Sequence, residues 1–139
     1  MPTKIKISVA ITNDRGDLLM LKEQVEKQNR PLWNIVKGTY GDHGIETIFD
    51  AARRECREEA SVEVELTGVT GCYVTGDADN YTVQFNFIGR VAGGDPKLPD
   101  ENEQASHGES IVELRWFSRR EVIELPKEEY ISEKIFAVI

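Results

Sequence analysis

Residues 46–62 of this chain read ETIFDAARRECREEASV. Three glutamates in this stretch, Glu55, Glu58 and Glu59, lie at positions i, i+3 and i+4. On an α-helix this spacing places the three carboxylates within an arc of roughly 100°. Like charges on adjacent turns repel each other by a few tenths of a kcal/mol per pair. The pattern therefore indicates either a solvated acidic surface or a set of ligands for a hard divalent cation.

The same stretch contains the predicted start of that helix. Thr47, with Asp50 three residues later, resembles a capping box and predicts a helix that begins near Thr47. Residues 37–44, just before it, contain three glycines and predict a loop with unusual backbone angles. The residues expected on the apolar face of the helix, with the glutamates to one side of it, are Ile48, Phe49, Ala52 and Cys56.

The residues that precede the glycines alternate between apolar and polar side chains, which predicts β-strands. Residues 4–11 have the period of a half-buried strand, residues 13–17 form a turn, and residues 18–21 return as the second strand of a hairpin. The polar residues 22–31 are predicted to be an exposed connection, and residues 33–36 a short strand.

Mostly β-structure is predicted after the helix. Residues 62–66 alternate, residues 72–75 and 81–91 form a hairpin, and residues 111–117 form another strand. The long segment 92–109 is rich in Gly, Pro, Asp and Glu and is predicted to be a structureless functional or mobile loop.

Two further helices are predicted near the end of the sequence. Ser118 to Glu121 forms a second capping box, for a short helix that ends near Pro126, and residues 128–139 have helical apolar spacing. Strands and helices thus mix without strict alternation. This order favours an α+β fold with a mixed sheet.

Composition limits the kinds of partner. The 139 residues, 40% of them hydrophobic, predict one domain over residues 1–139. The net charge of -8 argues against a nonspecific nucleic-acid binder or a protein that binds anionic membranes, because like charges would repel. A phosphorylated substrate would therefore need a cation to accompany it.

The cysteines and histidines are few. Cys56 and Cys72 lack CxxC spacing, and His43 and His107 are the two histidines, so neither a disulfide framework nor a closed zinc site is indicated. The sequence shows no signal peptide and no apolar run long enough to cross a bilayer. A soluble protein of the reducing cytoplasm is expected.

The acidic stretch resembles a known family signature. The Nudix box of the Nudix hydrolases is G-x5-E-x7-R-E-U-x-E-E-x-G-U, where U is a bulky aliphatic residue. Its four glutamates and its arginine match Glu46, Arg54, Glu55, Glu58 and Glu59 in register. The early hairpin, the tryptophan before the glycines and residues 113–117 before a Ser-capped helix extend the similarity over the whole chain. The resemblance implies a Nudix-type α/β/α sandwich with a mixed sheet.

Several positions depart from this signature. Tyr40 stands where the box has its first glycine, while Gly38 and Gly41 lie eight and five residues before the first glutamate. Cys56 occupies an aliphatic position and Ser61 a glycine position. The departures concentrate in the loop before the helix, which looks two residues longer than in the family.

The resemblance also implies roles for these residues. By similarity, Glu55, Glu58 and Glu59 bind Mg²⁺, with Mn²⁺ as the alternative, and the Gly38 carbonyl completes the shell. Mg²⁺ suits this chemistry because it stabilises charge on phosphoryl oxygens and lowers the pKa of bound water. In the family, Arg54 reaches back towards Glu46. An ordinary i, i+4 ion pair between Arg54 and Glu58 is the alternative.

Other candidates stand outside the signature. Relatives carry a catalytic carboxylate in the acidic loop, where Glu109 is preferred over the other acids and His107. Tyr40 and His43 are candidates for substrate binding, against a core or solvated role. Trp33, Tyr81 and Phe85 have the ring chemistry to stack on a base, although aromatic residues in strands more often pack in a core.

Two functions remain open. The first is a Mg²⁺-dependent hydrolase of a nucleoside diphosphate linked to another moiety, acting on a small-molecule nucleotide, with no nucleic-acid or membrane partner. The second is a catalytically weak nucleotide-binding or regulatory module of the same fold. The sequence identifies no particular nucleotide, and it leaves both a monomer and a homodimer open.

Overall fold

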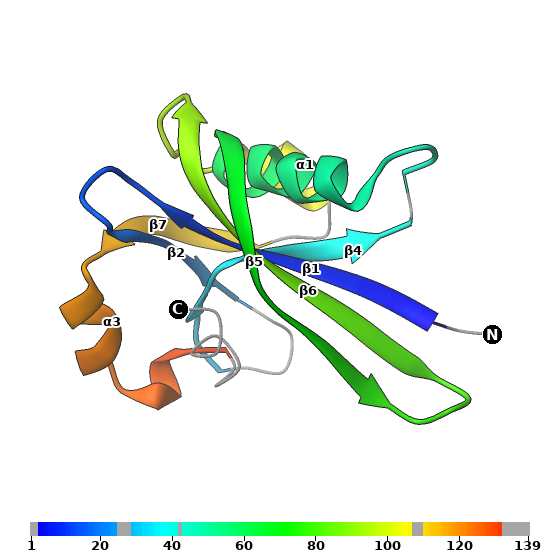
Figure 1. Ribbon diagram of the computed structural model, residues 1–139. Helices are drawn as coiled ribbons and strands as arrows, with labels where there is room; N and C mark the ends of the chain where they lie inside the picture. Colours follow the sequence, from blue (N-terminus) through cyan, green and yellow to red (C-terminus); the bar gives the residue numbers. More distant parts are fainter. Residues whose placement is uncertain (1–2, 25–28, 42, 107–109, 132–139) are drawn as a thin grey trace.

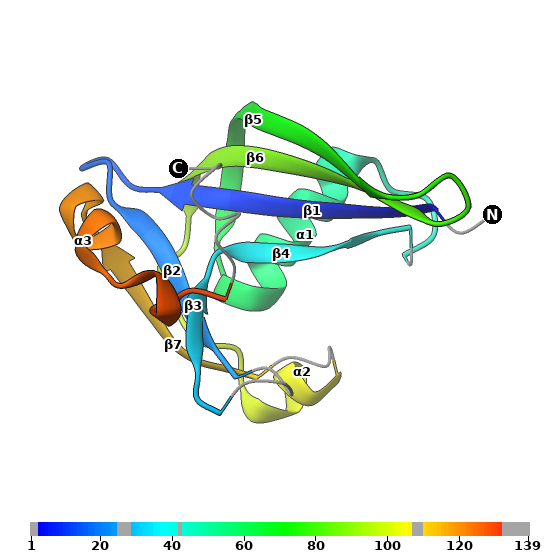
Figure 2. The same ribbon diagram turned by 90° about the horizontal axis from the view of Figure 1, so that it is seen from below.

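Among the residues that the structure describes, seven strands form one mixed β-sheet with helices on both of its faces (Figures 1 and 2). The computed structural model describes residues 3–24, 29–41, 43–106 and 110–131. The strands are β1 (Thr3–Thr12), β2 (Leu18–Glu23), β3 (Leu32–Asn34), β4 (Val36–Tyr40), β5 (Glu63–Gly76), β6 (Tyr81–Gly93) and β7 (Ile111–Phe117). The helices are α1 (Ile48–Ala60), α2 (Glu101–Ser106), α3 (Arg119–Glu124) and the short 3₁₀ helix η1 (Lys127–Glu129).

The sheet divides where β1 turns into β2. The predicted hairpin is confirmed: Thr12 pairs with Leu18, and the Asn13 side chain accepts hydrogen bonds from the backbone N–H groups of Arg15 and Asp17. Beyond the turn, β1 pairs with β4 and, in parallel, with β6, whereas β2 pairs with β3 and β7. The pairing of β1 with β2 therefore joins two groups of strands, β4-β1-β6-β5 and β3-β2-β7.

Each face of the sheet carries its own apolar core. On β1, Ile7 and Val9 pack with residues of α1, whereas Ala10, which directly follows Val9, packs on the opposite face with Val122 of α3. This alternation follows from the period of two in a strand. With α1 on one face and α3 on the other (Figure 1), the predicted α/β/α sandwich with a mixed sheet is confirmed.

Helix α1 begins and ends at local signals. Thr47 and Asp50 form the predicted capping box, with side-chain-to-backbone hydrogen bonds of 3.1 Å in each direction. The helix ends at Ser61, whose φ of 60° is left-handed and whose N–H donates to the Arg57 carbonyl. A left-handed C-terminal residue favours glycine. This conformation explains why a glycine suits the position that Ser61 occupies.

Two strand predictions are corrected. The predicted strand at 33–36 is two strands, β3 and β4, that belong to different parts of the sheet and separate at Ile35. Residues 37–40, predicted as loop, continue β4. In the described part of residues 37–44, positive φ angles occur at Gly41 and Gly44, with values of 111° and 69°. Propensity alone does not show where a strand changes partners, because pairing is a tertiary contact.

Two further corrections concern β5 and the end of β2. The predicted strands at 62–66 and 72–75 are one strand, β5, with register shifts near Leu66 and Val69. The hairpin from β5 to β6 is confirmed, with Gly76 opposite Tyr81. Lys22 and Glu23, predicted as exposed connection, are half-buried residues of β2.

The predictions for the segments after residue 92 are partly confirmed and partly corrected. The segment predicted as structureless contains α2, whose Gln104 side chain both donates to and accepts from the backbone of Ile111. The short helix before Pro126 is confirmed as α3. The helix predicted over 128–139 is wrong in its first turn, where η1 is followed by Tyr130 in extended backbone, and residues 132–139 lie outside the described part. None of the described helices is long and apolar enough to span a membrane.

Candidate active site

Gly38 of β4 faces Glu55 of α1 at close range. A Cβ at Gly38 would lie 2.1 Å from the Glu55 Cδ atom and 2.2 Å from its Oε1 atom. No side chain fits there without displacing the carboxylate. Glycine is therefore required at this position by the approach of Glu55, and not by a loop conformation.

Two of the three clustered glutamates are buried. Glu55 and Glu59 are 7% and 5% exposed, whereas the Glu58 side chain is 18% exposed. Glu55 and Glu59 are thus buried together with Cys56 of the predicted apolar face. Phe49 of that face differs, because it is 50% exposed. Buried carboxylates without matching charges are costly, so the site needs a cation or protons.

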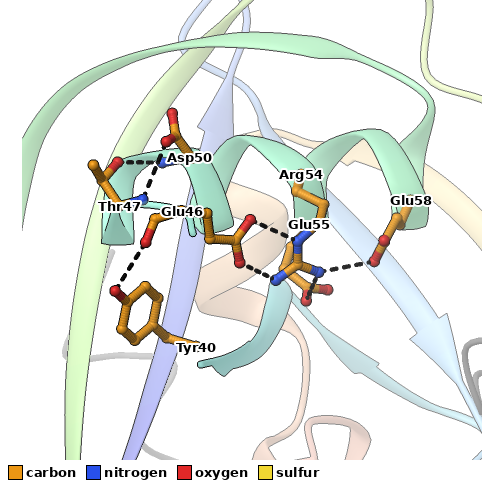
Figure 3. Close-up of polar contacts among 7 residues, drawn as sticks. All are labelled: Tyr40, Glu46, Thr47, Asp50, Arg54, Glu55 and Glu58. Atoms are coloured by element: carbon orange, nitrogen blue, oxygen red, sulfur yellow. Dashed lines mark hydrogen bonds and ion pairs between the residues drawn. The ribbon is translucent and has the colours of Figure 1, made fainter. Parts of the chain in front are cut away.

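Arg54 supplies part of that positive charge (Figure 3). Its Nε and Nη2 atoms donate to the two oxygens of Glu46 at 3.2 and 2.9 Å. Its Nη1 atom donates to Glu55 Oε1 at 2.8 Å and to Glu58 Oε2 at 3.3 Å. Both expected partners, Glu46 and Glu58, are thus engaged together, and Arg54 connects the loop before α1 to the carboxylates on the helix.

The carboxyl groups respond differently to this environment. The hydrogen bond from Arg54 holds the pKa of Glu46 below its ordinary value. Burial raises the pKa of Glu55, against a hydrogen bond with Glu59 and the charge of Arg54, while the nearby charge of Glu58 raises it further. Two carboxyl groups in hydrogen-bonding contact share a proton unless a cation takes its place.

The donor chemistry of this cluster fits a hard divalent cation. It offers carboxylate oxygens from one helix and a close-packed glycine opposite them, and Mg²⁺ prefers oxygen ligands. In the described part of the chain, no three acidic, histidine or cysteine side chains converge at metal-binding distance. Arg54 Nη1 is instead bonded to two of the glutamates. Binding of a cation therefore requires Arg54 and the glutamates to rearrange.

The remaining predicted residues lie apart from the carboxylates or outside the described residues. The Tyr40 hydroxyl donates to the Glu46 carbonyl at 2.8 Å (Figure 3), which ties β4 to the loop before α1. His43 is exposed in that loop, and its charge contributes to lowering the pKa of Glu46. Glu109 and His107 lie outside the described residues. Substrate contacts of Tyr40 and His43 stay predictions.

The aromatic candidates pack mainly in the interior. Trp33 is buried and its ring meets the edge of Phe117, with centroids 4.8 Å apart, so it is a core residue and not a free stacking surface. Tyr81 and Phe85 are half-buried on β6. Sequence patterns did not single out Asn34 of β3, which is buried, or Glu23 of β2, which is half-buried. Local sequence gives no signal for burial of this kind.

Replacing Arg54 by glutamine is expected to lower the free energy of unfolding by about 1–3 kcal/mol, between the values for exposed and buried ion pairs. The loss arises because Glu46, Glu55 and Glu58 lose their shared cation. Since Arg54 lowers the pKa of Glu46, that share of the stability is present above the unfolded pKa of a glutamate, about 4.3. It disappears as the pH falls through the lower folded value.

Urea denaturation at several pH values measures this difference. Arg57→Gln is the matched control, because Arg57 lies one turn further along α1 and makes a single exposed ion pair with Glu63 at 3.3 Å. It is expected to cost less than about 1 kcal/mol. Equal losses for the two variants, or a loss for Arg54→Gln that does not change towards acidic pH, would contradict the role given to Arg54.

Comparison with known proteins gives a consistent family. A family model described as the NUDIX domain matches residues 2–138. A search of the curated proteins found no match. The chain shares 22% identity and a TM-score of 0.75 with a NUDIX hydrolase from Nitrosomonas europaea, covering 99% of this chain and 86% of that one.

Two further solved structures share the fold. A MutT NUDIX hydrolase from Burkholderia pseudomallei is 18% identical, with a TM-score of 0.72 over 99% of this chain and 97% of that one. An ADP-ribose pyrophosphatase from Streptococcus suis is 20% identical, with a TM-score of 0.64 over 97% of this chain and 87% of that one. At these identities the similarity establishes the fold.

Proposed function

Because this chain belongs to the NUDIX domain family, we propose that it is a Mg²⁺-dependent hydrolase that cleaves a phosphoanhydride bond in a nucleoside diphosphate linked to another moiety. The observation that carries the proposal is the cluster on α1, in which Glu55 packs against Gly38 while Arg54 joins it to Glu46 and Glu58. The fold shared with an ADP-ribose pyrophosphatase supports a nucleotide of this class.

The glutamates are the proposed cation ligands. Glu55, Glu58 and Glu59, together with the Gly38 carbonyl, would hold Mg²⁺, or Mn²⁺ in its place. The bound ion supplies Lewis acidity towards phosphoryl oxygens and lowers the pKa of a coordinated water. Without it, the acidic cluster would repel a phosphorylated substrate.

The other residues of the cluster position these ligands. Arg54 makes two hydrogen bonds to Glu46 and so holds the loop against α1, and the Tyr40 hydroxyl holds the backbone of Glu46. Precise placement matters because small displacements of reacting groups are costly in rate. The general base is proposed to be Glu109, and substrate contacts are proposed for Tyr40 and His43.

A panel of nucleoside triphosphates, ADP-ribose, sugar nucleotides and dinucleoside polyphosphates tests the proposed activity. We expect at least one compound to be cleaved with Mg²⁺ present, and its turnover to stop when a chelator removes the cation. Chromatography of the products identifies the bond that breaks. Absence of metal-dependent turnover on every compound would contradict the proposed activity.

A nucleotide-binding or regulatory module is the second candidate. Two observations favour it. Arg54 Nη1 is hydrogen-bonded to Glu55 and Glu58, and no converging set of metal ligands is present among the described residues. Calorimetry separates the two. Tight nucleotide binding that does not depend on Mg²⁺, without product formation, would favour the module, whereas binding that requires the cation would favour the hydrolase.

The proposal includes the setting of the protein. It takes residues 1–139 as one domain that acts on small-molecule nucleotides in the cytoplasm, without nucleic-acid or membrane partners. Both cysteines are free thiols, Cys56 buried and Cys72 exposed, which suits a reducing compartment. Sedimentation analysis would distinguish a monomer from a homodimer.

A further inference from the structure

Asn34 of β3 carries an unusual hydrogen-bond donor. The residue is 7% exposed, and its Oδ1 atom accepts a hydrogen bond from the Ile35 N–H at 2.9 Å. In the described part of the chain, its Nδ2 atom is the one buried side-chain nitrogen or oxygen that has no hydrogen-bond partner. Buried polar groups almost always have partners, so this donor needs an explanation.

Glu23 of β2 is an acidic neighbour of this donor. Burial raises the pKa of Glu23, while the charge of Lys37 and the Asn34 amide both lower it. The carboxylate and the amide are therefore close, although Nδ2 makes no hydrogen bond of normal geometry. Glu23 is half-buried, so part of its side chain is open to solvent.

Both side chains lie on the same face of the sheet as the carboxylate cluster. Asn34 is directly opposite Leu21, which packs in the core beneath α1, and Glu23 is opposite Ile111 in the same core. Residues directly opposite in paired strands point to one face. Gly38, which faces Glu55, comes four residues after Asn34 on the next strand, β4, so the two residues lie at most roughly 14 Å apart.

Folding alone does not require an unpaired hydrogen-bond donor at this position. Leaving a buried donor unsatisfied costs about 1–3 kcal/mol, and an apolar side chain of similar size would remove that cost. Local violations of packing rules of this kind are expected at binding sites. The Glu23 carboxylate beside this donor offers hydrogen-bond acceptors. The pair thus presents one donor and one acceptor to a ligand.

We propose that Asn34 and Glu23 recognise the lactam edge of the substrate's nucleobase, that is, a ring carbonyl next to a ring N–H. Asn34 Nδ2 donates to the carbonyl, and the ring N–H donates to the Glu23 carboxylate. Guanine, hypoxanthine, uracil and thymine present this edge, whereas adenine and cytosine present an amino donor next to a ring acceptor. This specificity rests on the proposed hydrolase function.

The test compares base preference in the wild type and in Asn34→Ala, using GTP, ITP and UTP against ATP and CTP with Mg²⁺. The wild type is expected to prefer the lactam bases in kcat/KM. In Asn34→Ala, that preference should fall about tenfold or more, the loss expected for a hydrogen bond to a buried donor. The change should appear in KM.

Asn86→Ala is the matched control. Asn86 is also buried, but its Oδ1 atom accepts from Ser8 Oγ at 2.5 Å and from Gln84 Nε2 at 2.9 Å. Its replacement should lower stability and leave base preference unchanged. If Asn34→Ala also left base preference unchanged, the residue would have a structural role and the inference would be wrong.

A binding measurement separates failure of this inference from failure of the hydrolase proposal. Calorimetry with GMP and AMP reports base recognition without turnover, and GMP is expected to bind more tightly to the wild type but not to Asn34→Ala. Turnover of nucleotides with a base preference that Asn34→Ala leaves intact would overturn the inference and leave the hydrolase proposal standing. Equal binding of GMP and AMP to the wild type would also overturn it.

Discussion

Glu59→Gln is expected to lower Mg²⁺-dependent turnover about 10³-fold, because charge stabilisation by a bound cation is worth several kcal/mol and each ~1.4 kcal/mol is a factor of ten in rate. Glutamine keeps the size of the side chain and removes the charge. Glu59 is 5% exposed, so solvent screens the charge of its carboxylate only weakly. Glu58→Gln should act in the same direction.

Turnover on the best substrate of the panel measures this effect, alongside the Mg²⁺ concentration that gives half-maximal rate. Glu63→Gln is the control, since Glu63 follows the helix at the start of β5 and is exposed in an ion pair with Arg57. Its rate should match the wild type. Full activity in both Glu58→Gln and Glu59→Gln would show that these two carboxylates do not bind the catalytic cation.

Gly38→Ala is expected to reduce turnover about 10²-fold, the effect that a displacement of roughly 1 Å has on positioned reacting groups. The added methyl group would lie 2.1 Å from Glu55 Cδ, so the carboxylate must move away from β4. Overpacking of this kind also costs about 1–3 kcal/mol of stability. The backbone angles of Gly38 are not the reason, because its φ is not among the left-handed values.

Gly68→Ala is the matched control for this variant. Gly68 also lies in a strand, β5, and a Cβ there would meet no atom within 4 Å. Its turnover and stability should stay close to those of the wild type. If Gly38→Ala kept wild-type turnover and stability, Glu55 would have room to move without consequence, and the close approach of β4 would have no part in the site.

Local signals explain why the helix and its charges could be predicted from sequence. The capping box of Thr47 and Asp50 involves residues three positions apart, and the i, i+3, i+4 spacing of the glutamates is a property of any helix. The hairpin of β1 and β2 likewise depends on the turn at Asn13. Interactions within a few residues are present in the sequence itself.

The helical prediction near the end of the chain failed for the opposite reason. Apolar spacing predicted a helix from residue 128, but Tyr130 is buried against Trp33, and Ile131 N–H donates to the Trp33 carbonyl at 2.9 Å. The Tyr130 hydroxyl also donates to the Val122 carbonyl at 2.7 Å. Contacts with residues far away in the sequence overrode the local preference.

The sequence by itself determined that one helix carries a row of acids with Arg54, and that strands and helices mix along the chain without strict alternation. Only the tertiary structure decided that Glu55 and Glu59 are buried, that Gly38 leaves room for Glu55, and that Asn34 keeps a donor without a partner. The reason is physical. Helix formation and charge spacing depend on neighbouring residues, whereas burial and close approach depend on which strand packs against the helix.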